Sequence, residues 1–415
     1  MRNYASPRGD TAAADVAVVG AGVAGLAVAR EAARRGLSVT LIEAGGANEA
    51  GASRAAAGML APQAEAERAD DFFRFQQSAR DFYPAFAAAL YEESGRDVEL
   101  DRTGTLYLAL DDEDEAELRA RHEWQTRAAL PVERLTTAEA RELEPLVSER
   151  VRMALRFPRD WQVENRKLVE ALGLSVEQAY AGRVRWMRET TVTSLRTGPG
   201  GRVEGLETSR GFVAAGAVVV AAGARSSLIT VVANDDARAN AGGAARVEAD
   251  APRIEPVRGQ MLCFAQTSLH APLRHVVYTP RGYVVPRRDG RLLAGSTTER
   301  AGFSASVTPE GVRAIRARAV EIAPAIEGLP LTDSWAGLRP CAEDELPVVG
   351  ESASVAGLFY ATGHYRNGIL LAPLTGEIVA ALVAGEREYL SGLPFDLRAF
   401  SPARVAPALA ASQVE

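Results

Sequence analysis

The segment from Asp15 to Ala44 constrains the fold of this chain more than any other. An apolar run of β-forming residues ends in the pattern G-x-G-x-x-G, a stretch with helical spacing follows, and a second apolar run ends in an acidic residue. This order of elements is a βαβ unit with a glycine-rich turn after its first strand. The predicted elements are a strand at Val16–Val19, a helix at Val23–Arg35 and a strand at Leu37–Ile42.

Each glycine of the turn has a physical reason to be there. Gly20 permits the tight turn, Gly22 lets a pyrophosphate approach the backbone, and Gly25 lets the helix pack against the strand. Glu43, after the second strand, is placed to accept hydrogen bonds from ribose hydroxyls and disfavours an NADP-type 2′-phosphate. The segment predicts a dinucleotide site. A purely structural turn stays open, and the motif does not choose between NAD and FAD.

Composition limits the class of protein. The 415 residues are 47% hydrophobic and 24% charged, which is typical of a globular enzyme with room for two domains. The net charge of −7 argues against nucleic-acid and anionic-membrane partners, and Arg287 and Arg288 beside Asp289 are interpreted as a solvated turn. The N-terminus lacks a signal-peptide core, and no apolar run is long enough to span a membrane. We expect a soluble, cytoplasmic protein.

The only two cysteines, Cys263 and Cys341, have no metal-ligand spacing. Two cysteines with this spacing indicate a reducing compartment and no metal site. A single disulfide between them stays an open alternative.

Elements of two kinds follow the βαβ unit. The expected helices are Asp70–Ser94, Asp111–Ala128, Lys167–Tyr180, Thr308–Ile322 and Ile369–Val383. The expected strands are Leu100–Leu110, Val184–Met187, Thr191–Leu195, Arg202–Thr208, Phe212–Ala222, Arg258–Phe264, His275–Thr279, Tyr283–Arg287, Leu292–Ser296 and Leu358–Ala361. The closely spaced strands after Val257 indicate an antiparallel sheet in an inserted second domain. The stretch Ala233–Pro252 is interpreted as a flexible surface loop.

Four motifs together carry a family resemblance. GAGVAGLAVA, GASRAAAGMLAP, SWAGLRP and GHYRNGILLAP occur in this order, and small residues such as those of the second motif let a backbone approach a ligand. The chain resembles the FAD-dependent D-amino acid oxidase superfamily, and within it the thiamine-pathway glycine oxidases, from about Val16 to Gly385. The resemblance implies FAD as the cofactor.

The resemblance also implies an α/β fold in which a glutathione-reductase-type FAD-binding Rossmann domain carries an inserted substrate domain on a mixed or antiparallel sheet. We expect the FAD-binding domain to comprise 12–90, 151–228 and 332–392, and the substrate domain to comprise 91–150 and 229–331. Residues 1–11 and 393–415 are then tails. The residues implied at the cofactor are Gly20, Gly22, Val23, Ala24, Gly25, Glu43, Ala44, Ser53, Arg54, Ala57, Gly58, Met59, Ala222, Gly223, Arg339, His364, Arg366, Asn367, Gly368, Ile369 and Leu370.

Four residues acquire substrate-side roles from the resemblance. Arg339, in GLRP, matches the arginine that binds the substrate carboxylate, and a guanidinium can hold a carboxylate through two hydrogen bonds. Tyr283, in YVVPR, matches a tyrosine that helps to hold that carboxylate. Arg366 matches an arginine near substrate and flavin, and Met59 a methionine lining a small pocket. A structural role stays open for each of them: an ion pair for Arg339, a sheet aromatic for Tyr283, a turn cap for Arg366 and core packing for Met59.

Two positions depart from the expected pattern. Thr298 stands where a methionine is expected, so the size or polarity of the pocket can differ, and Cys341 stands where glycine is more usual. We interpret Cys341 as an unreactive thiol in preference to a flavin tether. His364 is assigned at most an indirect or flavin contact.

The resemblance implies hydride transfer from the Cα of a neutral amine to flavin N5, without an obligate protein base. Glycine, sarcosine or D-alanine would give the imine or 2-oxo acid, molecular oxygen would give hydrogen peroxide, and iminoglycine would serve thiamine thiazole synthesis. The alternatives are a dehydrogenase, a D-amino acid or sarcosine-type oxidase, and a flavin module of tRNA modification. A homo-oligomer, a tetramer by family alone, is also expected.

Overall fold

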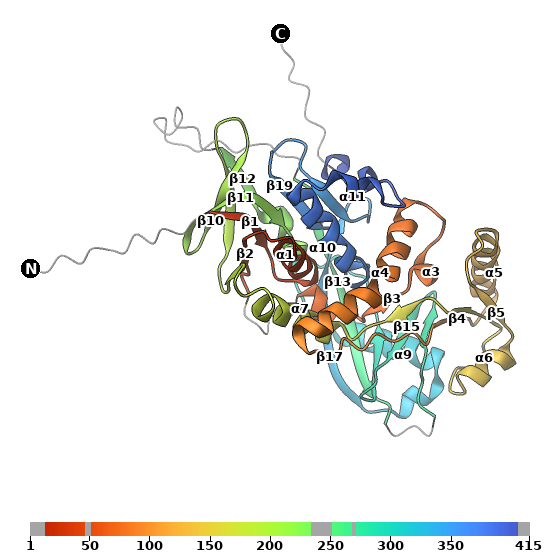
Figure 1. Cartoon of the computed structure of the whole chain (residues 1–415). Helices are drawn as coiled ribbons and strands as arrows, with labels where there is room; N and C mark the ends of the chain where they lie inside the picture. The colour runs from red at the N-terminus through yellow and green to blue at the C-terminus, as the bar shows by residue number, and fades with distance from the viewer. Residues whose placement is uncertain (1–12, 46–50, 234–250, 268–270, 406–415) are drawn as a thin grey trace, which may run out of the picture.

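A computed structural model describes residues 13–45, 51–233, 251–267 and 271–405. Within these ranges the strands form a nine-stranded, an eight-stranded and a two-stranded sheet. Figure 1 shows the nine-stranded sheet with β1 and β11 in one half of the molecule and the eight-stranded sheet with β13 and β15 in the other half. The predicted mixed α/β class is confirmed.

The nine-stranded sheet contains the predicted βαβ unit. Its order is β12-β9-β10-β11-β1-β2-β8, with β19 also beside β11 and β18 beside β19. The pairs of β1 with β2 and β11, of β2 with β8 and of β11 with β19 are parallel, as βαβ connections require. The strands are β1 (Ala14–Val19), β2 (Val39–Ile42), β8 (Val184–Met187), β9 (Val192–Thr197), β10 (Val203–Thr208), β11 (Gly211–Val220), β12 (Thr230–Ala233), β18 (Val348–Glu351) and β19 (Leu358–Thr362).

The eight-stranded sheet is mixed, with order β17-β13-β16-β15-β14-β4-β6-β5. Only its β14–β4 pair is parallel. The strands are β4 (Thr105–Ala109), β5 (Glu133–Leu135), β6 (Met153–Phe157), β13 (Ile254–Ala265), β14 (Val276–Thr279), β15 (Gly282–Pro286), β16 (Arg291–Gly295) and β17 (Leu331–Ala342). The small sheet pairs β3 (Met59–Leu60) with β7 (Trp161–Gln162).

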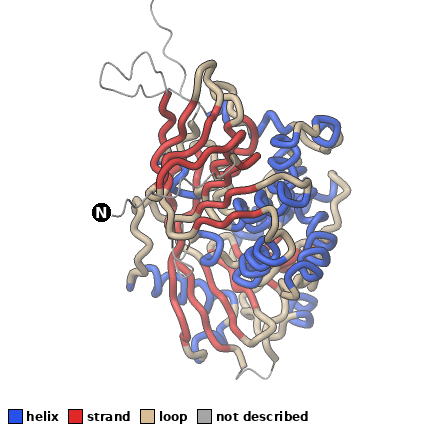
Figure 2. Tube along the Cα trace, turned by 60° about the vertical axis from the view of Figure 1, so that its left-hand side comes forward, coloured by secondary structure: helices blue, strands red, loops and turns tan. Residues whose placement is uncertain are grey.

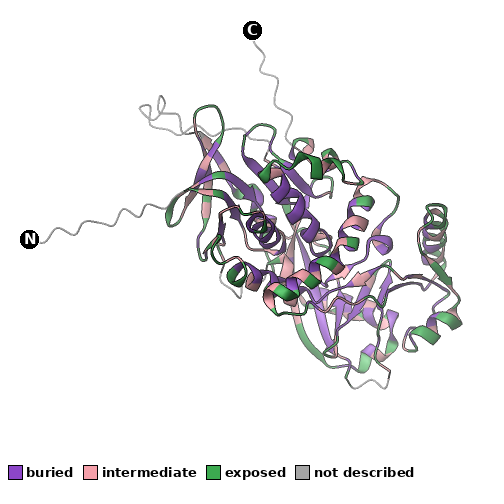
Figure 3. Cartoon of the chain, viewed as in Figure 1, coloured by how far each residue is buried: buried purple, intermediate pink, exposed green. Residues whose placement is uncertain are grey.

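Most helices lie on one side of the strands in Figure 2. Figure 3 shows α10 buried along most of its length, whereas α5 has an exposed face. The described helices are α1 (Val23–Arg34), α2 (Ala52–Ala55), α3 (Pro62–Glu65), α4 (Asp71–Ser94), α5 (Asp112–Arg127), α6 (Thr137–Leu143), α7 (Asn165–Gln178), α9 (Pro309–Ile322), α10 (Gly368–Ala384) and α11 (Arg387–Ser391). The 3₁₀ turns are η1 (Gly223–Leu228), η2 (Pro324–Gly328), η3 (Leu397–Phe400) and η4 (Pro402–Val405).

Close backbone contacts place α1 between the sheet and α10. A Cβ on Gly25 would lie 1.8 Å from the carbonyl oxygen of Gly20, so only glycine fits there. On its other side, a Cβ on Gly376 of α10 would lie 2.8 Å from the carbonyl oxygen of Ala27. Gly20 itself has φ +101°, where L side chains are strained. The predicted role of Gly25 in close helix packing is confirmed.

The predicted elements are present with end shifts of a few residues, but the structure adds several. β17 was not predicted, although it contains Arg339. The expected domain boundaries also differ from the sheets: β6 and β17 belong to the eight-stranded sheet, and β12 belongs to the nine-stranded sheet. The reason is that pairing partners lie far away in sequence, as for Met261 and Trp335.

Part of the predicted C-terminal tail is packed. Phe395 and Phe400 are buried and lie 4.7 and 5.2 Å from the ring of Phe75. Residues 393–405 are therefore not a tail, because these aromatic rings contribute to the core. The N-terminal tail at 1–11 and most of the predicted loop, 234–250, lie outside the described residues.

We predict that Gly25→Ala destabilises the protein by about 1–3 kcal/mol, because the added methyl group overpacks the β1–α1 contact. The midpoint of urea unfolding measures this change. Gly173→Ala in α7 is the matched control: its Cβ would lie 3.7 Å from Trp186, an ordinary contact. Since alanine favours helix, this control is expected to be neutral or slightly stabilising. Equal effects of the two substitutions would contradict the packing argument.

Candidate active site

The dinucleotide end of the site is the turn between β1 and α1. Gly22, the residue before α1, has no side chain to cap the helix. Apart from the N–H of Val23, which donates to Ser53, the helix start therefore offers backbone N–H groups and partial positive charge to an anion. Glu43 follows β2, and its carboxylate accepts hydrogen bonds from the N–H groups of Ala21 at 2.6 Å and Gly45 at 2.9 Å. A carboxylate has further acceptor positions, so these bonds leave capacity for ribose hydroxyls.

The small-residue segment predicted along the flavin lies beside this turn. Ser53, in α2, accepts a hydrogen bond from the N–H of Val23 at 3.0 Å, which places it at the start of α1. The side chain of Asn165 donates to the carbonyl oxygens of Ser53 at 2.9 Å and Arg54 at 3.1 Å. Ala222, also predicted at the cofactor, lies with its Cα 3.1 Å from a Cβ built on Gly20. Four separate stretches of sequence therefore meet at one edge of the sheet.

A second uncapped helix start belongs to α10. β19 ends at Thr362, and the turn that follows leads to Asn367, whose side chain does not cap the helix but accepts from Gln76 at 3.0 Å. His364 in this turn is 4% exposed, and its Nε2 lies 3.1 Å from the hydroxyl of Thr375. Burial lowers the pKa of His364 to about 4, so the ring is neutral at physiological pH.

Arg339 lies on β17 opposite Val257 of β13, and its side chain reaches the residues that follow β16. Its Nη2 donates to the hydroxyl of Ser296 at 2.8 Å, and its Nη1 donates to the carbonyl oxygen of Thr297 at 3.0 Å. A Cβ on Gly259 of the paired strand β13 would lie 2.3 Å from the guanidinium, so glycine leaves the room in which this group lies. None of these partners is a carboxylate, and the charge of Arg339 remains available to an anion.

Tyr283, on β15, points to the same end of β16. Its hydroxyl donates to Met261 Sδ at 3.4 Å, and a Cβ on Gly295 would lie 2.8 Å from that hydroxyl oxygen. Gly295 and Ser296 are consecutive, so the tyrosine hydroxyl and the guanidinium of Arg339 converge on one short segment. The sequence predicted both residues but not their meeting point.

Arg366 is held by an acidic residue that the sequence analysis missed. Its Nη2 lies 3.4 Å from Glu65 Oε1, which also accepts the hydroxyl hydrogen of Tyr278 at 3.0 Å. Glu65 raises the pKa of Arg366, and burial raises the pKa of Tyr278 well above its usual value, so the phenol remains a donor. The rings of Tyr278 and Tyr283 are 5.5 Å apart, which brings Arg366 to the same region.

Met59 lies beside the residues around Tyr283, whereas Thr298 and the two cysteines have different environments. The partly buried Met59 packs on the apolar cluster that contains Tyr283 and Met261. Thr298 is exposed. Both cysteines are free and buried, so the disulfide left open is not formed, and burial raises the pKa of the Cys341 thiol, which favours the unreactive form.

One interpretation of the sequence is wrong. Arg287 is 6% exposed and is not part of a solvated turn, whereas its neighbour Arg288 is exposed. The three charged residues 287–289 looked alike in sequence because no periodicity distinguishes them. The tertiary contacts of Arg287 separate it from the other two.

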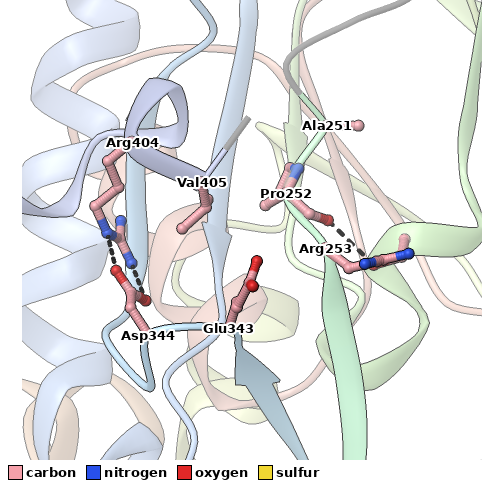
Figure 4. A pocket seen from close by; sticks show the side chains of 8 residues that line it. Ala251, Pro252, Arg253, Glu343, Asp344, Arg404 and Val405 are labelled. Carbon is pink, nitrogen blue, oxygen red and sulfur yellow. Dashed lines mark hydrogen bonds and ion pairs between the residues drawn. The ribbon is translucent and has the colours of Figure 1, made fainter. Parts of the chain in front are cut away.

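A separate cavity of about 690 Å³ lies away from these residues (Figure 4). Arg404 and Asp344 form an ion pair at its wall, with N–O distances of 2.7 and 3.1 Å. Its lining contains none of the residues predicted to bind cofactor or substrate. Within the part of the chain that the structure describes, no group of three or more His, Cys, Asp or Glu residues could hold a metal ion.

Comparison with known proteins defines the class. Residues 15–382 match the family model described as DAO, FAD dependent oxidoreductase. This chain belongs to that family, and its cofactor is FAD.

Two similar relatives and one solved structure are glycine oxidases. The chain is 37% identical to a glycine oxidase of Geobacillus kaustophilus over 92% of this chain and 96% of the relative, and 32% identical to one of Pseudomonas aeruginosa over 92% and 97%. A crystal structure of the glycine oxidase from Geobacillus kaustophilus superimposes with a TM-score of 0.83 at 35% identity, covering 95% of this chain and 99% of that one. The predicted family resemblance is confirmed.

The residues present fit FAD. A cradle at Gly20 and Gly25 that a Cβ would fill and the start of α1 would suit the pyrophosphate, and the acid Glu43 would suit the ribose. The uncapped start of α10 supplies partial positive charge at a second place. The individual cofactor contacts stay predictions. Among the described residues, no helix is long and apolar enough to cross a membrane.

We predict that His364 makes the protein sensitive to acid. Above pH 6.5 the ring is neutral in both the folded and the unfolded state. As the pH falls from 6.5 to about 4, only the unfolded state gains the proton, so the free energy of unfolding decreases by roughly 3 kcal/mol in total. His364→Gln removes this contribution and should flatten the pH dependence, measured by urea unfolding between pH 7 and 4.

His122→Gln, on the partly exposed surface of α5, is the matched histidine substitution for comparison. An equal slope in wild type and His364→Gln would contradict the assignment of this buried neutral ring.

Proposed function

We propose that this enzyme oxidises glycine and small relatives such as sarcosine and D-alanine to the imine, which hydrolyses to the 2-oxo acid, and passes the electrons to oxygen as hydrogen peroxide. The glycine oxidases that match almost the whole chain support this activity. A D-amino acid or sarcosine-type preference and a dehydrogenase remain the alternatives within the family.

The observation that carries the proposal is the convergence of Arg339 and Tyr283. A fork of two donors and a phenolic hydroxyl from two different strands meet at Gly295 and Ser296. Such an arrangement suits the two oxygens of a carboxylate, because a guanidinium binds both in its plane and the hydroxyl adds a third donor.

FAD, when bound, accepts the hydride from the substrate Cα. The protein residues orient the substrate for that transfer. Arg339 and Tyr283 fix the carboxylate, which sets the position of Cα, and this fixed geometry is worth more to the rate than any single proton transfer. Arg366 adds positive charge, which Glu65 offsets at 3.4 Å. The neutral His364 is bonded to Thr375 and is not needed as a base.

We infer that apolar side chains limit the size of the substrate. Met261 and Tyr283 belong to one buried cluster, and the partly buried Met59 packs against it, so apolar atoms would face the Cα substituent. The exposed Thr298 does not belong to this cluster. This packing favours glycine over amino acids with large side chains.

A place in thiamine biosynthesis follows from other relatives. The bifunctional protein ThiO/ThiG of Trichormus variabilis is 30% identical over 90% of this chain, which spans 53% of that protein. The imine of glycine would then be consumed in thiazole formation. The cytoplasmic location, the homo-oligomer and the absence of nucleic-acid partners stay predictions from the sequence.

We predict that Arg339→Ala lowers kcat/KM for glycine by roughly 30-fold or more, mainly through KM, since removal of a charged partner costs about 2–5 kcal/mol. Arg339→Lys keeps the charge but loses the fork, so its loss should be intermediate. Peroxide release by the FAD-loaded protein over a panel of glycine, sarcosine and D-alanine measures both.

Arg300→Ala is the matched control, because that exposed arginine pairs with Glu255 at the surface. It should keep its activity within about twofold. Unchanged substrate affinity in Arg339→Ala would contradict the carboxylate assignment. Failure of the FAD-loaded wild type to release peroxide with any of the three substrates would contradict the proposed function.

A further inference from the structure

Arg287 is a buried cation that no role described so far explains. It follows β15 directly, four residues after Tyr283, and its N–H donates to the carbonyl oxygen of Arg291 at 2.8 Å, which continues the pairing with β16. Its side chain turns inward, and the whole residue is 6% exposed. Burying an arginine costs free energy unless its donors are satisfied.

The guanidinium binds four oxygens from two separate stretches of chain. Nη1 donates to the side-chain oxygen of Gln162 at 2.8 Å and to the carbonyl oxygen of Val163 at 3.0 Å. Nη2 donates to the carbonyl oxygen of Ala57 at 2.6 Å and to the side-chain oxygen of Asn165 at 3.3 Å. All four acceptors are neutral, and they bind only the two terminal nitrogens, because the buried Nε has no hydrogen-bond partner among the described residues. Burial lowers the pKa of Arg287 to about 10, so the group is still charged at neutral pH.

Gly58 shows how tightly this contact is built. It has φ +76°, and a Cβ there would lie 2.1 Å from the carbonyl oxygen of Val163 and 3.0 Å from Arg287 Nη2. The N–H of Val163 also donates to the carbonyl oxygen of Gly58 at 2.9 Å. The backbone at 57–58 is therefore held by hydrogen bonds from two sides, directly before Met59.

We propose that Arg287 is a positioning residue that holds the flavin-side segment Ala57–Met59 at a fixed place relative to the strand that carries Tyr283. This inference rests on the proposed function and on the predicted position of that segment along the flavin. β15 lies between β14 and β16 in the sheet, so it transmits a fixed spacing of about 13 Å from Arg287 to Tyr283. The substrate carboxylate and the flavin then keep one relative position.

The fork of arginine is required for this role. Each terminal nitrogen binds two acceptors, and a lysine ammonium in the same place cannot span Ala57 and Gln162 in one plane. Arg287→Lys keeps the positive charge and loses the geometry. Arg287→Met loses both and keeps much of the apolar volume.

The test uses the full chain loaded with FAD, the two Arg287 variants, and Arg288→Met as the matched control. Arg288 is exposed and contacts Asp97 and the carbonyl oxygen of Leu100 at 3.2 Å each. Three quantities are measured. They are kcat with glycine, the Kd of FAD from titration of the apoprotein, and the Kd of glycolate from the flavin absorbance change. Glycolate has a hydroxyl in place of the amine of glycine and so reports binding of the carboxylate alone.

In Arg287→Lys we expect kcat to fall by about 10-fold or more, because a shift of about 1 Å of the flavin relative to the substrate slows the reaction steeply. We also expect the Kd of FAD to rise, because Ala57–Met59 loses its fixed position. The Kd of glycolate should change by less than about threefold, since Arg339 and Tyr283 stay on their strands. Arg288→Met should match the wild type in all three quantities.

A merely structural arginine gives a different result. Wild-type kcat and wild-type FAD affinity in loaded Arg287→Lys, with only a lower melting temperature, would overturn the inference. A rise in the Kd of FAD in a protein whose wild type does not oxidise glycine would instead reject the proposed function and keep the contact at Ala57–Met59.

Gln162→Leu covers the case in which neither Arg287 variant folds. It removes one of the four acceptors and should give a smaller loss of kcat with the same unchanged Kd of glycolate. Wild-type kcat in this variant would then overturn the inference.

Discussion

The pairing of β13 with β17 is the constraint on which the rest of the site depends. Both strands have twelve residues, and their register runs from Ile254 opposite Ala342 to Phe264 opposite Leu331. At one end, the backbone of Cys341 forms an isolated antiparallel β-bridge with His364, in the turn that follows β19 of the nine-stranded sheet. In the middle, Trp335 Nε1 donates to the carbonyl oxygen of Ala55 at 2.9 Å. β17 thus joins the eight-stranded sheet to both the small-residue segment and the turn before α10.

Guanidinium contacts between distant segments help to fix the geometry of this junction, although only Arg287 is buried, Arg339 is partly buried and Arg366 is exposed. Apolar packing tolerates small shifts, whereas a guanidinium fork has few arrangements in which both terminal nitrogens reach acceptors. Arg339 over Gly259, Arg287 against Ala57, and Glu65 against Arg366 are three such contacts. Each joins segments more than fifty residues apart in sequence, and together they give the site one shape.

Local signals made much of the fold predictable. The period of apolar residues, the caps at Asp70 and Thr308, and the glycine turn at Gly20 depend on neighbours within a few residues. β17 was not predicted because Gly337 and Pro340 interrupt its strand pattern. The strand is stabilised by its pairing with β13. The contacts of Glu65 and Tyr278 with the site were not predicted because neither residue lies in a recognisable motif. No pattern in the neighbouring sequence indicates that Arg287 is buried.

The sequence by itself determined the βαβ unit, because its glycine spacing records the close approach of backbone to a nucleotide. The family and the cofactor FAD came from the resemblance that the four motifs carry together. It also named Arg339, Tyr283, Arg366 and Met59 as candidates. Only the tertiary structure decided that Arg339 and Tyr283 meet at Gly295 and Ser296, that Glu65 offsets Arg366, and that Arg287 is buried. These facts depend on strand register and on contacts across the chain, which no local pattern encodes.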